Sequence, residues 1–369
     1  MIRIGSSWVV AAGLLFSLGC ADGTFVLGHL SEDATGPDAS TSDAFIGNGD
    51  ASGGTGGSAG AGGTGGSGGN ACTVTSKPAV RRGLNVHFVV DSSFGIALQP
   101  VWGQITQALS SFVDDPSNAG IGVGIRYFGT SCNEADYAVP DVPVTLLPTG
   151  AAAIKQSTVG RLPLDGLGAA IAPAVTGGLL YASGVQRDDS DRLTRVVLIT
   201  DGIFDITCGA DVAKAKLAAG VAYDSVPSVS TYVIGIDGVL LAAVPSDLTP
   251  LDEIAAEGGT AAAWRVVADT TSEAQIEAAM REIRLDADPC SYRLPDGYTF
   301  ENSALEWRAA GGNSMPAFWG RVANEAACTT STSMYLSPSS DRYVDLCPNA
   351  CRLVRANPAG TVKFVTVCP

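Results

Sequence analysis

Two stretches of the sequence place a carboxylate directly after an apolar run. Residues 84–90 read Leu-Asn-Val-His-Phe-Val-Val and are followed by Asp91 and, two positions later, by the hydroxyl of Ser93. Residues 195–200 read Arg-Val-Val-Leu-Ile-Thr and are followed by Asp201. Apolar, β-branched runs of this length are typical of strands buried on both faces of a parallel sheet. Because the carboxyl ends of such strands meet at one edge, we expect these oxygens to share a crevice.

Oxygen ligands in such a crevice are suited to a hard divalent cation, Mg²⁺ or Ca²⁺. A purely structural role is the alternative, in which Asp91 and Asp201 cap helix N-termini or hydrogen-bond the neighbouring loops. Asp-Gly at 201–202 would then be an ordinary turn at the end of a strand.

Hydrolysis by these aspartates, assisted by a metal, is the least favoured chemistry. The sequence has only two histidines: His87 lies within the first apolar run, and His29 lies outside any segment for which we predict a fold. His-Glu-x-x-His and phosphate-loop motifs are absent from the sequence, and no Gly-x-Ser-x-Gly elbow occurs outside the Gly-rich residues 53–69. We therefore predict that the protein is not an enzyme and binds no nucleotide.

Strand and helix patterns alternate from residue 84 to residue 284. This alternation predicts an α/β fold with a doubly wound, mostly parallel sheet. The predicted strands cover 84–91, 122–128, 142–147, 195–200, 229–236 and 263–267. The predicted helices cover 98–113, 168–182, 211–223, 250–257 and 273–284.

The residues of both strand ends carry a family resemblance. Phe88-Val-Val-Asp-Ser-Ser93, Leu198-Ile-Thr-Asp-Gly202 and the spacing of the elements resemble a von Willebrand factor type A (vWA) domain over 72–288. The resemblance implies a Rossmann-like fold and a metal-ion-dependent adhesion site. In that family a divalent cation on a D-x-S-x-S loop, a threonine and a second aspartate leaves a coordination position for a partner's carboxylate.

The match to this adhesion site is incomplete, so the site is degenerate. Asp91, Ser93 and Asp201 match the first aspartate, the first serine and the final aspartate. Gly95 stands at the second serine and Leu162 at the threonine, although Asp165 is close enough in sequence to substitute for a lost ligand. Each lost oxygen should weaken cation binding.

The first 71 residues predict export and a tether. Residues 1–19 resemble a lipoprotein signal peptide, with an apolar run too short to span a bilayer and Ser17-Leu-Gly before Cys20, the expected site of acylation. Ser17 departs from the leucine that is usual there, and ordinary secretion is the alternative. Residues 20–71 are rich in Gly and Ser and should form a flexible linker. With this anchor, linker and domain, the chain resembles the Gly/Ser-tethered vWA lipoproteins of delta-proteobacteria and myxobacteria.

Residues 289–369 predict a small, Cys-rich, β-rich module. Without Cys20 the sequence has an even number of cysteines, which favours disulfides. A zinc site at Cys347 and Cys351 is the alternative, and it is disfavoured because no second cysteine or histidine pair has zinc spacing. The aromatic residues of this module are expected to form its core, with a glycan-binding surface as the alternative. The disulfide candidates are Cys72, Cys132, Cys208, Cys290, Cys328, Cys347, Cys351 and Cys368.

The charge and the anchor limit the partners. A formal net charge of -15 excludes nucleic acid as a plausible partner, because its phosphates would be repelled. We predict a binding or adhesion module that recognises a protein or another surface ligand through the crevice. Contact with a membrane is expected only through the lipid anchor, on the bacterial cell envelope and at its outer membrane. The alternative function is a metal-free scaffold in an envelope or secretion assembly.

Overall fold

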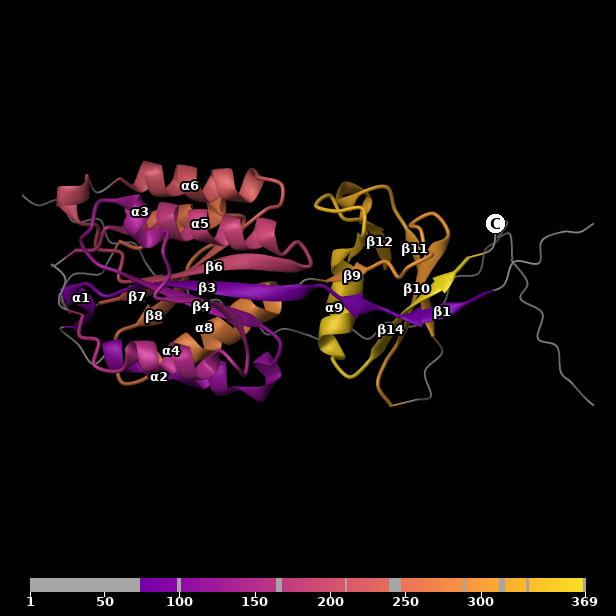
Figure 1. Ribbon diagram of the computed structural model, residues 1–369, viewed down its shortest axis with the longest axis horizontal. Coiled ribbons are helices and arrows are strands. Elements are labelled where there is room, and N and C mark those ends of the chain that lie inside the picture. Colours follow the sequence, from indigo (N-terminus) through magenta and orange to yellow (C-terminus); the bar gives the residue numbers. More distant parts are fainter. Residues whose placement is uncertain are drawn as a thin grey trace, which may run out of the picture. The chain divides into compact units, whose positions relative to one another are not determined.

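The structure is a computed structural model with two β-sheets, one of six strands and one of eight (Figure 1). The signal peptide, Cys20 and the linker lie outside the residues that it describes. Those residues belong to one compact unit, Gly69–Pro369. They are 74–97, 101–163, 168–209, 211–238, 247–287, 290–311, 316–329 and 332–367.

The six-stranded sheet has the order β5-β4-β3-β6-β7-β8. All neighbouring strands are parallel except β5, which is antiparallel to β4. Strand β3 lies in the sheet interior and its residues 84–91 are all buried, which explains why the run is mostly apolar. The strands are β3 (Gly83–Asp91), β4 (Gly122–Phe128), β5 (Val142–Leu146), β6 (Arg192–Thr200), β7 (Ser230–Asp237) and β8 (Trp264–Val267).

Helices cover both faces of this sheet. In Figure 1, α3, α5 and α6 lie on one face and α2, α4 and α8 on the other. Successive side chains of β3 point to opposite faces of the sheet. Phe88 therefore packs with residues of α2 and α8, and Val89 with residues of α5 and α6. The helices are α1 (Phe94–Ala97), α2 (Val101–Asp114), η1 (Pro116–Asn118), α3 (Glu134–Tyr137), α4 (Ala151–Thr158), α5 (Ile171–Asp188), η2 (Ile206–Cys208), α6 (Val212–Asp224), α7 (Thr249–Glu257) and α8 (Ser272–Ala287).

The α/β class predicted from the sequence is confirmed, whereas several elements differ from the predicted ones in their existence or bounds. Helices α3 and α4 are too short to show a clear apolar period, so the sequence patterns did not reveal them. Helix α5 runs to Asp188 rather than to 182. Its end is held by the buried Gln186 amide, which donates to Arg192 O at 2.6 Å and accepts from Thr194 N at 2.6 Å.

The strands of the eight-stranded sheet come from two parts of the chain, one before and one after the segment that forms the six-stranded sheet. Strands β1 (Ser76–Pro78) and β2 (Val80–Arg81) precede β3, whereas the other strands follow α8. The sheet is mixed, because β11 and β12 are parallel and the other pairs are antiparallel. The remaining elements are β9 (Ser291–Arg293), β10 (Ser303–Arg308), β11 (Ala317–Arg321), η3 (Glu325–Ala327), β12 (Ser333–Leu336), β13 (Tyr343–Leu346), α9 (Pro348–Ala356) and β14 (Thr361–Thr366).

The segment after α8 was expected to be β-rich, and it contains one helix besides its strands. Helix α9 places Val354 against the sheet, in a core with Trp319 and Phe364. Most of the aromatic residues considered for a ligand surface belong to or pack against this core. Phe318 and Tyr335 do not belong to it; Tyr335 is buried elsewhere, whereas Phe318 has an exposed fraction of 60%.

Six of the predicted cysteines form three disulfides. Cys347 and Cys351 bond to different partners, so the alternative of a zinc site at this pair does not apply. Cys72 and Cys368 lie outside the described residues, and their pairing stays a prediction. The bridges are Cys132–Cys208, Cys290–Cys351 and Cys328–Cys347. Within the part of the chain that the structure describes, no helix has the length and apolar character needed to cross a bilayer.

Candidate metal and ligand crevice

The register of β3 and β6 brings the two predicted aspartates to the same edge of the sheet. Val90 pairs with Ile199, so Asp91, the last residue of β3, lies beside Thr200, and Asp201 follows at once. All three side chains are buried, with exposed fractions of 0%, 0% and 1%. The two strand ends therefore bring the predicted aspartates together at one edge, as expected, in a buried group with Ser93 and Thr200 that we call the crevice.

The Asp91 carboxylate has a hydrogen bond to each oxygen. Its Oδ1 accepts from Ser93 N at 2.8 Å, and its Oδ2 accepts from Thr200 Oγ1 at 2.7 Å. Burial raises the pKa of Asp91 above its usual value, although the hydrogen bonds from Thr200 and Ser93 act in the opposite direction. These bonds also orient the loop that follows β3.

The Asp201 carboxylate has one oxygen without a partner. Its Oδ1 accepts from Ile203 N at 3.0 Å, whereas its buried Oδ2 has no hydrogen bond to any described residue. Burial, and then the charge of Asp91, raise the pKa of Asp201 well above its usual value. The Ser93 hydroxyl lies close enough to Asp91 to favour the charged carboxylate, but it makes no hydrogen bond of acceptable geometry.

These atoms fit the donor chemistry of a hard cation. Two carboxylates and a hydroxyl are oxygen ligands, and two of the oxygens, Asp201 Oδ2 and Ser93 Oγ, lack partners among the residues that the structure describes. A cation would also compensate two neighbouring negative charges that are buried together. The donor set is small, because the described residues contain no group of three or more His, Cys, Asp or Glu side chains placed to hold a metal.

The positions that depart from the family's pattern add no ligand. Gly95 has no side-chain oxygen and lies in α1. Leu162 is a surface residue with an exposed fraction of 69%. Asp165, the predicted substitute, lies outside the described residues. The structural alternative accounts for both oxygens of Asp91 and for Oδ1 of Asp201, but it leaves Oδ2 of Asp201 without a role.

The sequence patterns missed two hydroxyls that organise the crevice. Thr200 bonds to Asp91 and accepts from Gly202 N at 3.2 Å, which places it between the two aspartates. Ser92 donates to Phe128 O from its Oγ at 2.9 Å and from its N at 2.8 Å, and thereby joins the ends of β3 and β4. In the sequence these two residues could have been found because each carries a hydroxyl directly next to one of the two aspartates.

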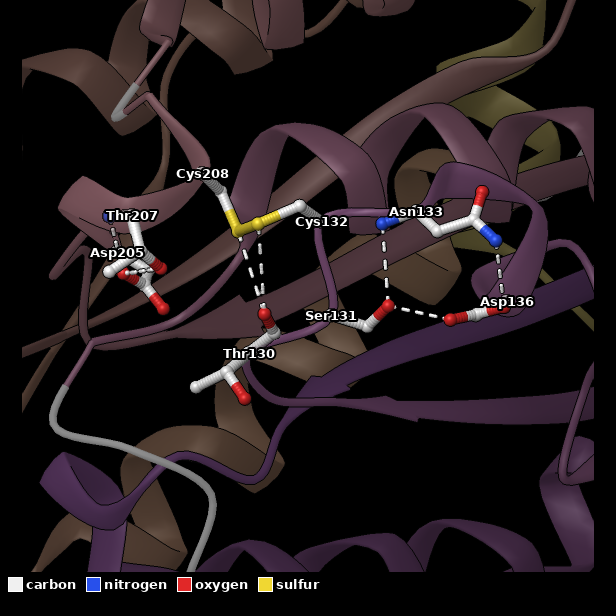
Figure 2. The surroundings of a disulfide bond; sticks show 8 residues. All are labelled: Thr130, Ser131, Cys132, Asn133, Asp136, Asp205, Thr207 and Cys208. Carbon is white, nitrogen blue, oxygen red and sulfur yellow. Dashed lines mark hydrogen bonds between the residues drawn. A yellow bond between two sulfur atoms is a disulfide. The ribbon is translucent and has the colours of Figure 1, made fainter.

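A disulfide ties together the loops at this edge (Figure 2). Cys132 lies in the loop after β4, and Cys208 ends η2 in the segment that begins with Asp201. Both sulfurs contact Thr130 O, at 3.9 and 3.5 Å. The same segment pairs with the chain before α5, because Ala169 N donates to Ile203 O at 2.8 Å and Asp205 N donates to Ala169 O at 2.8 Å. The backbone around Asp201 is therefore held from two sides.

We expect removal of this disulfide to weaken cation binding as well as the fold. The double variant Cys132→Ala/Cys208→Ala should lose up to about 4 kcal/mol of stability from the loop that the bridge closes. It should also lose roughly tenfold in cation affinity, as for other groups that orient metal ligands. Calorimetry with Mg²⁺ and urea denaturation measure the two effects.

The Cys328→Ala/Cys347→Ala variant is the matched control, since it opens a bridge in the eight-stranded sheet. It should lower stability and leave cation affinity unchanged. Equal cation affinities in the two double variants would contradict a role of the Cys132–Cys208 bridge at the crevice.

Comparisons with known proteins show only distant likenesses. No protein-family model and no curated protein matches the sequence. An aerotolerance-related membrane protein from Bacteroides fragilis is 18% identical, with a TM-score of 0.38, over 55% of this chain and 99% of that one. The pilus adhesin SpaC from Lactobacillus rhamnosus GG is 12% identical, with a TM-score of 0.40, over 77% of this chain and 39% of the adhesin. The manganese-loaded TRAP protein from Plasmodium vivax is 15% identical, with a TM-score of 0.33, over 44% and 61%. Likenesses this distant identify neither a ligand nor an activity of this chain.

Proposed function

We propose that the protein is a binding module that recognises a protein partner through the crevice, with a divalent cation held by Asp91, Ser93 and Asp201. The observation that carries this proposal is the buried Oδ2 of Asp201, which has no partner in the described part of the chain and is close enough to feel the charge of the buried Asp91. Buried carboxylates of this kind need a proton or a cation for compensation.

The small donor set favours binding over catalysis. When bound, the cation would supply positive charge and open coordination positions to a carboxylate of the partner. The one described histidine cannot serve the crevice as a base, since His87 is fully buried and its ring lies 4.6 Å from that of Tyr181. Burial lowers the pKa of His87 to about 3. We therefore propose that the protein is not an enzyme.

The place of action is the second part of the proposal. Three disulfides fit an exported protein, because disulfides persist in oxidising compartments. The sequence Ser17-Leu-Gly-Cys20, which resembles the cleavage site of a lipoprotein signal peptide, supports acylation at Cys20. It also supports anchoring to the outer membrane of a bacterial envelope, as in the vWA lipoproteins that the sequence resembles. The linker of residues 20–71 would then separate the folded part from the membrane.

A metal-free scaffold is the competing function, and one observation favours it. Both oxygens of Asp91 already have hydrogen bonds, so this carboxylate is satisfied without a cation. A scaffold of this kind would keep its stability and its partner when divalent cations are removed.

Cation titration of the wild-type protein and of Asp91→Asn distinguishes the two functions. We expect Mg²⁺, Mn²⁺ or Ca²⁺ to bind the wild type with a Kd of about 0.1–1 mM, at the weak end of protein sites. Binding to the native state alone should raise Tm in proportion to the logarithm of the cation concentration. Asp91→Asn should abolish both effects.

Asp115→Asn is the matched control, because Asp115 caps η1 and lies outside the crevice. It should leave cation binding unchanged. A wild-type Tm that does not respond to saturating cation, with no heat of binding, would remove the cation from the proposal and favour the scaffold.

A further inference from the structure

A polar cavity of about 610 Å³ opens next to the crevice at the same edge of the sheet. Ser92, which lies between the two site residues Asp91 and Ser93, forms part of its wall. The rest of the wall comes from the end of β4 and from the loop and helix α3 that follow it. The segment before β5 and the segment after α4 complete it. The cavity therefore borders the crevice and has walls of its own.

Two arginines in the wall share one carboxylate. Arg161 Nη2 lies 2.7 Å from Asp141 Oδ1, and Arg126 Nη1 lies 3.3 Å from Asp141 Oδ2. The same Oδ2 accepts from Tyr127 N at 2.9 Å. Asp141 is thus shared by both guanidinium groups, while Asp136, the second carboxylate of the lining, balances the formal charge but bonds to Ser131 and Asn133 instead.

Both guanidinium groups are held in place by aromatic rings. Arg161 Cζ lies 4.1 Å from the ring centroid of Tyr127, and Arg126 Cζ lies 5.5 Å from that of Tyr137. The side chains keep 34% and 22% of their surface exposed, so a ligand can reach them. Stacked, planar guanidinium groups are pre-organised for a bidentate contact and lose little entropy on binding.

The wall also offers a donor that the protein leaves unused. Among the residues that the structure describes, the buried Arg126 Nε has no hydrogen-bond partner. Asp136, the other carboxylate at the cavity, already accepts from Ser131 Oγ at 2.6 Å and from Asn133 Nδ2 at 3.0 Å (Figure 2). A ligand that enters the cavity must therefore bring acceptors, and a carboxylate matches the fork of an arginine.

We propose that this cavity is a carboxylate subsite, which takes an acidic side chain of a polypeptide partner next to the carboxylate bound at the crevice. The rim favours a side chain with methylene groups, because Val139 lines the cavity with 64% of its surface exposed. The inference rests on the proposed function for its partner, but the two have separate residues. It predicts that the partner presents a pair of acidic residues.

The probe for this subsite is a short, fluorescently labelled Glu-Ser repeat peptide, with a Gln-Ser repeat as its neutral counterpart. Anisotropy is measured with saturating Mg²⁺ and again with EDTA. We expect Arg161→Gln and Arg126→Gln each to weaken binding of the Glu-Ser peptide by roughly tenfold or more, the value of a hydrogen bond between charged groups. Both variants should keep the wild-type affinity for Mg²⁺ measured by calorimetry.

Two further variants separate this effect from a general loss of charge or fold. Arg161→Lys keeps the charge without the planar fork and should recover only part of the affinity. Arg265→Gln is the matched control, since Arg265 also pairs with an aspartate, Asp252, at 2.6 Å. Arg265 lies on β8, the edge strand at the other end of the strand order from β5. This variant should bind the peptide as the wild type does.

Each contrary outcome has one meaning. If the arginine variants bind like wild type while Asp91→Asn does not, the subsite is wrong and the proposed function stands. If the arginine variants fail while Asp91→Asn binds normally, the subsite stands and the cation-dependent function is wrong. Equal binding of the Gln-Ser peptide, or preferential binding of a uronate polymer such as alginate, would overturn the assignment to an acidic polypeptide.

Discussion

Replacement of Asp201 by asparagine is expected to stabilise the cation-free protein and to abolish its response to divalent cations. The Oδ2 of Asp201 is buried without a partner, and its charge faces that of Asp91. Asparagine removes this charge and keeps the acceptor for Ile203 N. The gain should be about 1–3 kcal/mol, the cost of a buried polar group without a partner.

The pH dependence of the same site has a definite sign. The pKa values of both carboxyls are raised in the folded state, so above a pH of about 4 the folded protein holds protons that the unfolded chain has lost. Stability of the cation-free protein therefore falls as pH rises through the raised pKa values. Because protons and cations compete for the same oxygens, cation affinity should fall as pH is lowered.

Urea denaturation in EDTA, with and without added Mg²⁺ and over a range of pH, measures these effects. Asp115→Asn is a control of opposite sign, since the hydrogen bonds from Ser117 lower the pKa of Asp115. That variant should lose stability at neutral pH and keep the cation response. A destabilised Asp201→Asn that still responds to Mg²⁺ would show that Asp201 has only a structural role.

Acid is expected to destabilise the protein through His87. Its ring is fully buried in β3, neither ring nitrogen has a partner, and it lies against Tyr181. Burial, and then the charge of Arg126, lower the pKa of His87 to about 3 from 6.5. The unfolded chain therefore takes up a proton that the folded protein refuses as pH falls from 6.5 to about 3. Protonation across this window should remove up to about 5 kcal/mol.

His87→Leu should remove most of this dependence. Leucine fills a similar volume, does not titrate and leaves no buried nitrogen unsatisfied, so the variant should also gain about 1–3 kcal/mol at neutral pH. The difference in unfolding free energy between variant and wild type, measured from pH 7 to pH 4, should widen steadily in favour of the variant. His29→Gln removes the other histidine as a control. A difference that stays constant with pH would exclude His87 as the acid-sensitive group.

Local sequence was sufficient to predict the strands that carry the crevice. The runs before Asp91 and Asp201 are apolar because β3 and β6 lie in the interior of the sheet, and the polar residues mark where each strand leaves it. The prediction that these aspartates share an edge follows from parallel pairing alone. It required no knowledge of side-chain contacts.

Other features depended on contacts between residues that are far apart in sequence. Cysteine parity predicts disulfides, but it cannot show that Cys132 bonds to Cys208 across the carboxyl edge. Thr200 has the same local sequence whether or not its hydroxyl reaches Asp91. The free oxygen of Asp201 was likewise visible only once every neighbouring donor had been placed.

The carboxylate subsite shows most clearly what tertiary structure decided. Arg126, Asp141 and Arg161 follow no common pattern in the sequence. Strand β5 is antiparallel to β4, with Val142 opposite Ile125, so its first residues lie at the carboxyl end of β4. A parallel β5 would have placed Asp141 at the other edge of the sheet, away from both arginines. The sequence by itself thus determined the two strand ends and their aspartates, whereas the direction of one edge strand determined what lies beside them.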